Sequence, residues 1–122
     1  MDQETQDALT SRVSEDHEQA VATINVLCRL SYDIAHANGF YYGVRDDRAK
    51  SAALLKLTEE TLEVLKADRV EGIAARDAAV GDELADVIIT ALSLARDRGY
   101  NIGYLVMDKM RRNITRGWRH GK

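Results

Sequence analysis

Two clusters of carboxylates are the residues of this sequence best suited to chemistry. The first is Glu59-Glu60-x-x-Glu63, and the second is Glu83-x-x-Asp86. Residues three apart lie on one side of a helix, so each cluster would point its acids in one direction. Neither cluster has a His or Cys beside it, and ligand sets made of oxygen alone are typical of hard cations. Two such helices side by side would bring four carboxylates together, which indicates Mg²⁺, or Mn²⁺ in its place, with a phosphate substrate.

The surroundings of the second cluster strengthen the case for a metal. The helix expected here is apolar over most of its circumference, so we expect it to be buried nearly all round. Its polar residues form one narrow stripe, in which no Lys or Arg occurs between Asp82 and Ala95. A buried carboxylate such as Asp86 costs several kcal/mol unless it is neutralised, paired or bound to a metal. Metal binding explains the stripe best; a bond to an Arg of a neighbouring helix or to a water is the alternative.

The first cluster is ambiguous when it is taken alone. An apolar arc of this segment is formed by Leu54, Leu57, Thr58, Thr61, Leu62 and Leu65. The charged residues Lys56, Glu59, Glu60 and Glu63 occupy the opposite side. An ordinary solvated face has the same pattern, and Lys56 with Glu60 fits a surface pair at i, i+4.

A stripe near the C-terminus changes from apolar to cationic. Ile102, Leu105 and Val106 begin what we expect to be the inner face of a helix, and Lys109, Asn113 and Arg116 continue that face. Cations on such a face could bind phosphate oxygens. The alternative is a helix that emerges into solvent after Met110. The last fourteen residues, KMRRNITRGWRHGK, contain six Lys or Arg and no acid, so they favour an anionic ligand.

The elements that must position these residues are helices. Proline is absent, and the glycines fall mostly where helices would end, so we predict an all-α bundle of four to five helices. Its first helical region runs over 3–37, with a break near Ser14 as one option and Ala20, Ile24, Leu27, Leu30 and Ile34 as its apolar repeat. The second begins after Asp46 or Asp47 and reaches about Lys66. The third spans about 75–98, and the fourth runs from Asn101, its N-cap, to about Arg116.

Length and cysteine usage bound the remaining possibilities. A chain of 122 residues fits one domain, over residues 1–122. The single cysteine, Cys28, excludes an intramolecular disulfide and is expected in the core; the N-terminus is acidic and lacks a signal-peptide pattern. No apolar run approaches the roughly 18 residues of a membrane span. We therefore expect a soluble cytoplasmic protein without a membrane partner.

Together these motifs resemble the MazG-like, all-α nucleoside triphosphate pyrophosphohydrolases. The signature of that family is E-E-x-x-E followed, after some twenty residues, by E-x-x-D. LLKLTEETLEVLKA and GDELADVIITALSLA contain the two elements here, and KMRRNITRGWRHGK is similar to the family's Lys-x-x-x-Asn-x-x-Arg ending. The resemblance covers about residues 49–122.

The resemblance implies Mg²⁺-dependent hydrolysis of a (deoxy)nucleoside triphosphate to the monophosphate and pyrophosphate, with house-cleaning of the nucleotide pool as one role. It gives the Mg²⁺ to four acids: Glu60, Glu63, Glu83 and Asp86. Glu59 would orient or deprotonate the attacking water. The residues that would bind phosphates or sugar are Lys109, Asn113 and Arg116, with Lys56 as a further candidate. Similar proteins are homodimers or homotetramers.

Base binding would need an aromatic platform, which Phe40, Tyr41, Tyr42 and Trp118 could supply. A cluster that closes the end of the bundle is the alternative for Phe40 and the two tyrosines. Trp118 could equally pack across a dimer.

Three other functions are alternatives. A di-iron bundle needs two Glu-x-x-His elements, and only Asp33-x-x-His36 comes close. A nucleic-acid binder fits the basic tail, but the rest of the chain is acidic and has no recognised binding motif. A non-catalytic helical interaction module or nucleotide-binding regulator stays open as the alternative, although it leaves the acidic stripe around Asp86 unexplained.

Overall fold

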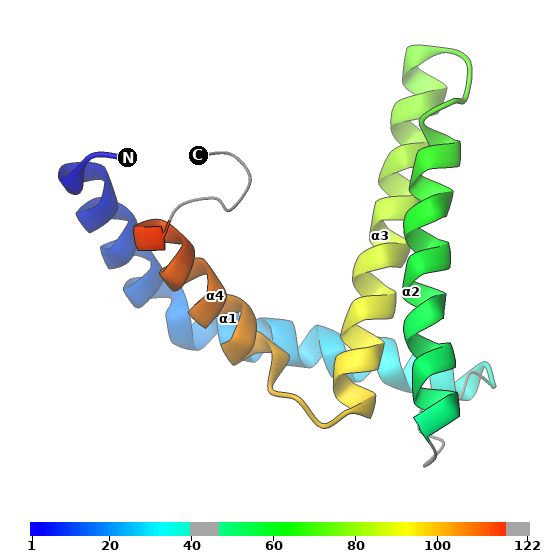
Figure 1. The fold of residues 1–122 in the computed structure, drawn as a ribbon, viewed down its shortest axis with the longest axis horizontal. Helices are drawn as coiled ribbons and strands as arrows, with labels where there is room; N and C mark the ends of the chain where they lie inside the picture. Colours follow the sequence, from blue (N-terminus) through cyan, green and yellow to red (C-terminus); the bar gives the residue numbers. More distant parts are fainter. Residues whose placement is uncertain (40–46, 117–122) are drawn as a thin grey trace. The chain divides into compact units, whose positions relative to one another are not determined.

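All the regular secondary structure in the part of the chain that the structure describes is helical. The computed structural model describes residues 1–39 and 47–116, and for residues 47–52 it describes the backbone alone. Over those ranges there are four helices and no strand: α1 (Gln3–Ala37), α2 (Asp47–Ala67), α3 (Ile73–Asp97) and α4 (Ile102–Arg116) (Figure 1). The predicted all-α class is confirmed, and α1 continues past Ser14 without a break. None of the described helices combines the length and the apolar character that a membrane span requires.

The chain divides into two compact units. The first unit comprises Met1–Leu27 with Asn101–Lys122, and the second comprises Cys28–Tyr100. Helix α1 therefore contributes its N-terminal part to one unit and its C-terminal part to the other. The expectation of a single domain over residues 1–122 stays a prediction.

Helices α2 and α3 form the centre of the second unit. They lie side by side (Figure 1), and because only residues 68–72 join them, they run antiparallel. Buried or half-buried residues recur along both helices at alternating intervals of four and three, the spacing of a coiled-coil seam. We call this set the inner seam: Ala53, Leu57, Glu60, Val64 and Ala67 of α2, with Val80, Glu83, Val87, Thr90 and Leu94 of α3. Two of its positions, one on each helix, are glutamates.

The C-terminal part of α1 packs against the end of α3. The Cys28 thiol donates a hydrogen bond to the carbonyl oxygen of Leu92 at 3.0 Å, and burial raises the pKa of this thiol, so the expectation of a core cysteine is confirmed. The face of α1 that is buried here carries the small residues Cys28 and Ser31. Leu30 and Ile34, which we expected on the apolar repeat that faces the core, are exposed instead.

A glycine ends α3 as the sequence indicated. Gly99 has φ of 74°, a left-handed conformation that costs residues with a Cβ more. Its N–H donates to the carbonyl of Arg96, and the N–H of Tyr100 donates to the carbonyl of Ala95, both at 3.0 Å. This pair of bonds is the Schellman motif, which satisfies the last carbonyls of the helix.

In the first unit, two asparagines cap the start of α4 against α1. The Asn101 side chain accepts a hydrogen bond from the N–H of Tyr104 at 3.2 Å, which confirms it as the N-cap. Asn25 of α1 accepts a bond from the N–H of Gly103 at 2.9 Å and donates to Asn101 at 2.8 Å. Gly103 lies so close to Val21 that a Cβ in its place would overlap the carbonyl oxygen of Val21.

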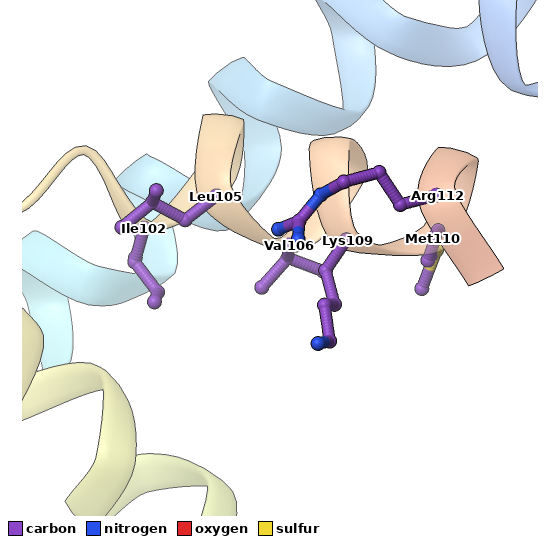
Figure 2. A pocket seen from close by; sticks show the side chains of 6 residues that line it. All are labelled: Ile102, Leu105, Val106, Lys109, Met110 and Arg112. Atoms are coloured by element: carbon purple, nitrogen blue, oxygen red, sulfur yellow. The ribbon is translucent and has the colours of Figure 1, made fainter. Parts of the chain in front are cut away.

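The buried face of α4 is rotated somewhat from the expected one, with Ile102 and Val106 half-buried and Leu105 exposed. Gly103, Met107 and Ile114 are buried, whereas Ile102, Leu105 and Val106, which we expected on the inner face, line an open pocket of about 420 Å³ (Figure 2). The close approach of the two backbones at Gly103 sets this rotation of α4 about its axis.

Candidate metal centre

Three of the predicted acids meet where the middle turns of α2 and α3 lie side by side. Glu60 comes from α2, and Glu83 and Asp86 come from α3. One carboxylate oxygen of each lies within 4.8 Å of the other two. The antiparallel inner seam causes this meeting, because it places the central turn of α2 beside the central turns of α3. Asp86 follows Glu83 by three residues and so extends from the same side of α3.

The spacing of these oxygens suits one hard cation. Two oxygens on opposite sides of a Mg²⁺ ion are about 4.2 Å apart, twice the usual metal–oxygen distance. The three carboxylates thus need only small side-chain movements to share an ion. Their oxygen-only chemistry also matches Mg²⁺ or Mn²⁺ better than a softer metal.

The raised pKa of Glu83 indicates that the carboxylates of the centre repel one another. Partial burial raises the pKa of Glu83, and the neighbouring carboxylates of Asp86, Glu63, Asp82 and Glu60 raise it further, in that order. All four neighbours that raise the pKa of Glu83 are acids. A cation would remove this repulsion and favour the ionised form of Glu83.

Lys56 is the cation that the structure places at the centre itself. Its ammonium group lies 3.1 Å from a carboxylate oxygen of Glu60, at i, i+4 spacing. The side chain of Glu60 is only 15% exposed, which an ordinary surface pair would not require. The pair expected in the alternative interpretation of Lys56 is therefore present, and it lies beside the proposed ligands.

Glu59 and Glu63, the other two acids of the first cluster, are not among the three that meet at the centre. Glu63 accepts a bond from Lys66 at 3.1 Å, and its charge still contributes to the raised pKa of Glu83. Glu59 is exposed. Both stand one residue before an inner-seam position, as do Lys56, Asp82 and Asp86. We call these five residues the charged side of the hairpin.

The structure corrects one expectation about burial. We expected Asp86 to be buried because α3 is apolar over most of its circumference, but Asp86 is exposed and Glu83 is half-buried. The reason is that Asp86 stands one position before Val87 of the inner seam, which turns it by about 100° around the helix from the line of contact with α2. The cost of burying acids therefore falls on Glu60 and Glu83. The sequence did contain a signal for this: Glu60 occupies a core position in the series Ala53, Leu57, Val64 and Ala67.

The predicted phosphate-binding residues of α4 belong to the first unit. Their spacing places Lys109, Asn113 and Arg116 on one face, and the Arg116 guanidinium donates to the side-chain oxygen of Asn113 at 3.2 Å. Lys109 lines the open pocket with Ile102, Leu105, Val106, Met110 and Arg112, and Figure 2 shows its side chain extending away from the ribbon of α4.

Two further arginines of α4 share one acid. Asp108 accepts hydrogen bonds from Arg111 at 2.8 Å and from Arg112 at 2.9 Å. The bond from Arg111, followed by that from Arg112, holds the pKa of Asp108 below its ordinary value. Arg111 and Arg112 are thus partly neutralised within the helix.

The residues expected to recognise the base, Tyr41, Tyr42 and Trp118, lie outside the described residues, as does Phe40. Their predicted role stays a prediction.

Comparisons of the chain with known proteins found no matching family model, no similar curated protein and no similar solved structure. The resemblance to the MazG-like enzymes therefore rests on the sequence motifs.

Proposed function

We propose that this protein hydrolyses a (deoxy)nucleoside triphosphate to the monophosphate and pyrophosphate with the help of Mg²⁺ or Mn²⁺. The observation that supports the proposal is the convergence of Glu60, Glu83 and Asp86, whose oxygens lie within 4.8 Å of one another. Removal of damaged or unwanted nucleotides from the pool is the cellular role that the resemblance favours.

Packing of the helix pair alone does not explain why acids occupy this centre. Glu60 and Glu83 occupy inner-seam positions where apolar residues would stabilise the helix pair better. Neighbouring acids and partial burial disfavour the charged form of Glu83. Such perturbed groups concentrate at functional sites. Glu60, Glu83 and Asp86 would hold a divalent cation, which would supply positive charge to offset the negative charge on the substrate phosphates as the phosphoanhydride breaks.

The residues around the centre have complementary roles in this proposal. Glu59, exposed beside Glu60, accepts the proton of the attacking water. Lys56, whose ammonium group lies 3.1 Å from Glu60, supplies a positive charge beside the phosphates. The triphosphate-binding role of Lys109, Asn113 and Arg116 follows from the resemblance. The products define the broken bond as the anhydride between the α- and β-phosphates, with one water consumed.

A product assay tests the proposal. The purified full chain is incubated with Mg²⁺ and a panel of common and modified nucleoside triphosphates, and pyrophosphate is scored separately from orthophosphate. We expect pyrophosphate release that stops in excess EDTA. Release of orthophosphate alone, or full activity with EDTA, would contradict the proposal.

Two variants of the same helix assign the activity to the centre. Asp86→Asn removes one of the three converging carboxylates and should reduce turnover at least about a hundredfold, since even residues behind a metal ligand contribute 10- to 100-fold. Asp82→Asn removes an equally exposed acid that is not one of the three, and it should retain most of the activity. Equal losses in both variants would point to general electrostatic attraction.

A non-catalytic helical module, including a nucleotide-binding regulator, is the second candidate. Large apolar side chains of α2 and α3 are exposed, among them Leu55, Leu62 and Ile89, and such residues can serve a protein partner. Nucleotide binding without turnover in the assay above would favour this candidate.

A further inference from the structure

Helix α4 carries an open pocket of about 420 Å³, and we infer that it binds a small amphipathic anion, an apolar chain that ends in a carboxylate. We call it the α4 pocket, and its lining residues are Ile102, Leu105, Val106, Lys109, Met110 and Arg112 (Figure 2). All six belong to the first unit, whereas the three converging acids belong to the second. The inference is therefore independent of the proposed function, and its test uses neither a metal nor a nucleotide.

The floor of the α4 pocket is an apolar patch on one side of the helix. Its residues follow one another at intervals of three, one and four, the spacing of a single helical face: Ile102, Leu105, Val106 and Met110. Leu105 and Met110 are 45% and 51% exposed, so a ligand chain lying on them would remove apolar surface from water on both partners. The volume of the pocket falls within the range of roughly 300 to 1,000 Å³ that is usual for small-molecule sites.

Two cations lie beside this apolar patch. Lys109 and Arg112 are three residues apart and so are neighbours on the surface of α4. Figure 2 shows the Lys109 side chain extending away from the ribbon, and the Arg112 side chain running back along α4. Arg112 donates to Asp108 through its Nε, so its two terminal nitrogens keep N–H groups with which a ligand can bond. Paired N–H groups of this kind match the two oxygens of a carboxylate.

The charge distribution of the first unit favours a small anion. Helix α4 contains four Lys or Arg and one acid, whereas residues 3–27 of α1 contain five acids and one arginine. The positive potential is thus concentrated on α4, and a neutral or cationic amphiphile would gain nothing from it. The acids of α1 are exposed, and they would repel an extended anionic surface within a Debye length of about 8 Å. A small ligand on α4 avoids most of this repulsion, so we favour it over a membrane.

Calorimetric titration of the full chain with octanoate, kept below the concentration at which it forms micelles, tests the inference. We expect one octanoate to bind per chain. Decanoate should bind at least about threefold more tightly, since burial of each CH₂ tightens binding up to about fourfold. The uncharged analogue 1-octanol should bind at least about tenfold more weakly, since it lacks the charged hydrogen bond. Absence of binding by both acids would overturn the inference.

Two pairs of variants locate the site. Arg112→Gln should weaken octanoate binding about tenfold or more. Arg111→Gln should leave it unchanged, because Arg111 has the same charge and bonds to the same Asp108, at 2.8 Å, but does not line the pocket. Leu105→Glu should abolish binding, because it places an acid against the ligand. Ile89→Glu is its control, since Ile89 is 47% exposed in the second unit.

Circular dichroism of each variant shows that its helices persist. Equal losses in Arg112→Gln and Arg111→Gln would overturn the inference, because they would indicate diffuse attraction. Binding that survives Leu105→Glu but is lost with Ile89→Glu would overturn it by placing the ligand on the α2–α3 hairpin. A chain that sediments with phosphatidylserine vesicles but binds no octanoate would overturn it as well, and would indicate a face that docks on membranes.

Discussion

Replacement of Gly103 by alanine should destabilise the protein, although alanine is the better helix former. A Cβ at this position would overlap the carbonyl oxygen of Val21, and it would lie 3.0 Å from both the Cα of Val21 and the side-chain oxygen of Asn25. Two of these three atoms belong to the backbone of α1, so no side-chain rotation can relieve the overlap. Helix α4 would have to move away from α1.

The size of the effect follows from three contributions. Alanine gains about 1 kcal/mol over glycine in a helix. Overpacking of a close contact costs about 1 to 3 kcal/mol, and the movement weakens the bond from Gly103 N–H to Asn25, worth about 1 kcal/mol. We expect the free energy of unfolding to fall by about 1 to 3 kcal/mol, or the Tm by about 4 °C for each kcal/mol.

Gly81→Ala is the matched control. Gly81 also lies inside a helix, but a Cβ there would meet no atom within 4 Å, so this variant should gain about 1 kcal/mol. Urea unfolding of both variants, followed by circular dichroism at one protein concentration, gives the comparison. Equal stabilisation by both substitutions would refute the close packing of α1 and α4.

Three further predictions address charge, burial and the basic helix. The pKa of Glu83 in the folded protein lies above its ordinary value of 4.5, so the metal-free native state binds a proton more tightly than the unfolded chain. The free energy of unfolding should therefore rise as the pH falls through that folded pKa towards 4.5. In urea titrations, a Glu83→Gln variant or added Mg²⁺ should abolish this pH-dependent rise. Ser93 is 0% exposed, and its hydroxyl has no hydrogen-bond partner among the residues that the structure describes. Ser93→Ala should therefore stabilise the protein by about 1 kcal/mol, and a loss of that size would show that the hydroxyl is bonded. Arg116→Ala should weaken kcat/KM by the equivalent of about 1.5 to 3 kcal/mol for a lost charged hydrogen bond, whereas Arg111→Ala should change it little; equal losses would indicate diffuse attraction.

Local signals in the sequence sufficed to predict the helices. Helix α1 has the predicted bounds, and the observed ends of the other three helices lie within two residues of the predicted ones. The signals that predicted these ends come from neighbouring residues, although Asn25 of α1 also bonds to the first turn of α4. Gly99 adopts the left-handed conformation that closes α3, and Asn101 caps α4. Such interactions span only a few residues, so a single sequence contains them.

The rotation of each helix toward its partners was harder to predict. Both α2 and α3 carry more apolar surface than one contact can cover, so Leu54 and Leu65 seemed as suitable for the core as Leu57. On α4, Ile102 and Val106 are half-buried as part of the expected inner face, but Leu105 is exposed, because the contact with α1 depends on a small residue, Gly103. Which arc is buried depends on the partner helix, and hydrophobicity alone does not define it.

The candidate centre was predicted in its residue types but not in its geometry. Of the four acids predicted to hold the metal, the structure brings together Glu60, Glu83 and Asp86. It leaves Glu63 with Lys66 and Glu59 exposed. The distinction arises from the inner seam, which fixes the side of α2 that faces α3. The raised pKa of Glu83 likewise depends on charges from both helices.

Mn²⁺ binding, followed by the electron paramagnetic resonance signal of the free ion, tests the central claim most directly. The claim is that Glu60, Glu83 and Asp86 together hold one divalent cation. The account predicts that wild-type protein and the Asp82→Asn control deplete the free-ion signal with the same affinity, that Asp86→Asn binds at least about tenfold more weakly, and that Mg²⁺ competes for the site. Identical Mn²⁺ affinities for all three proteins would contradict it.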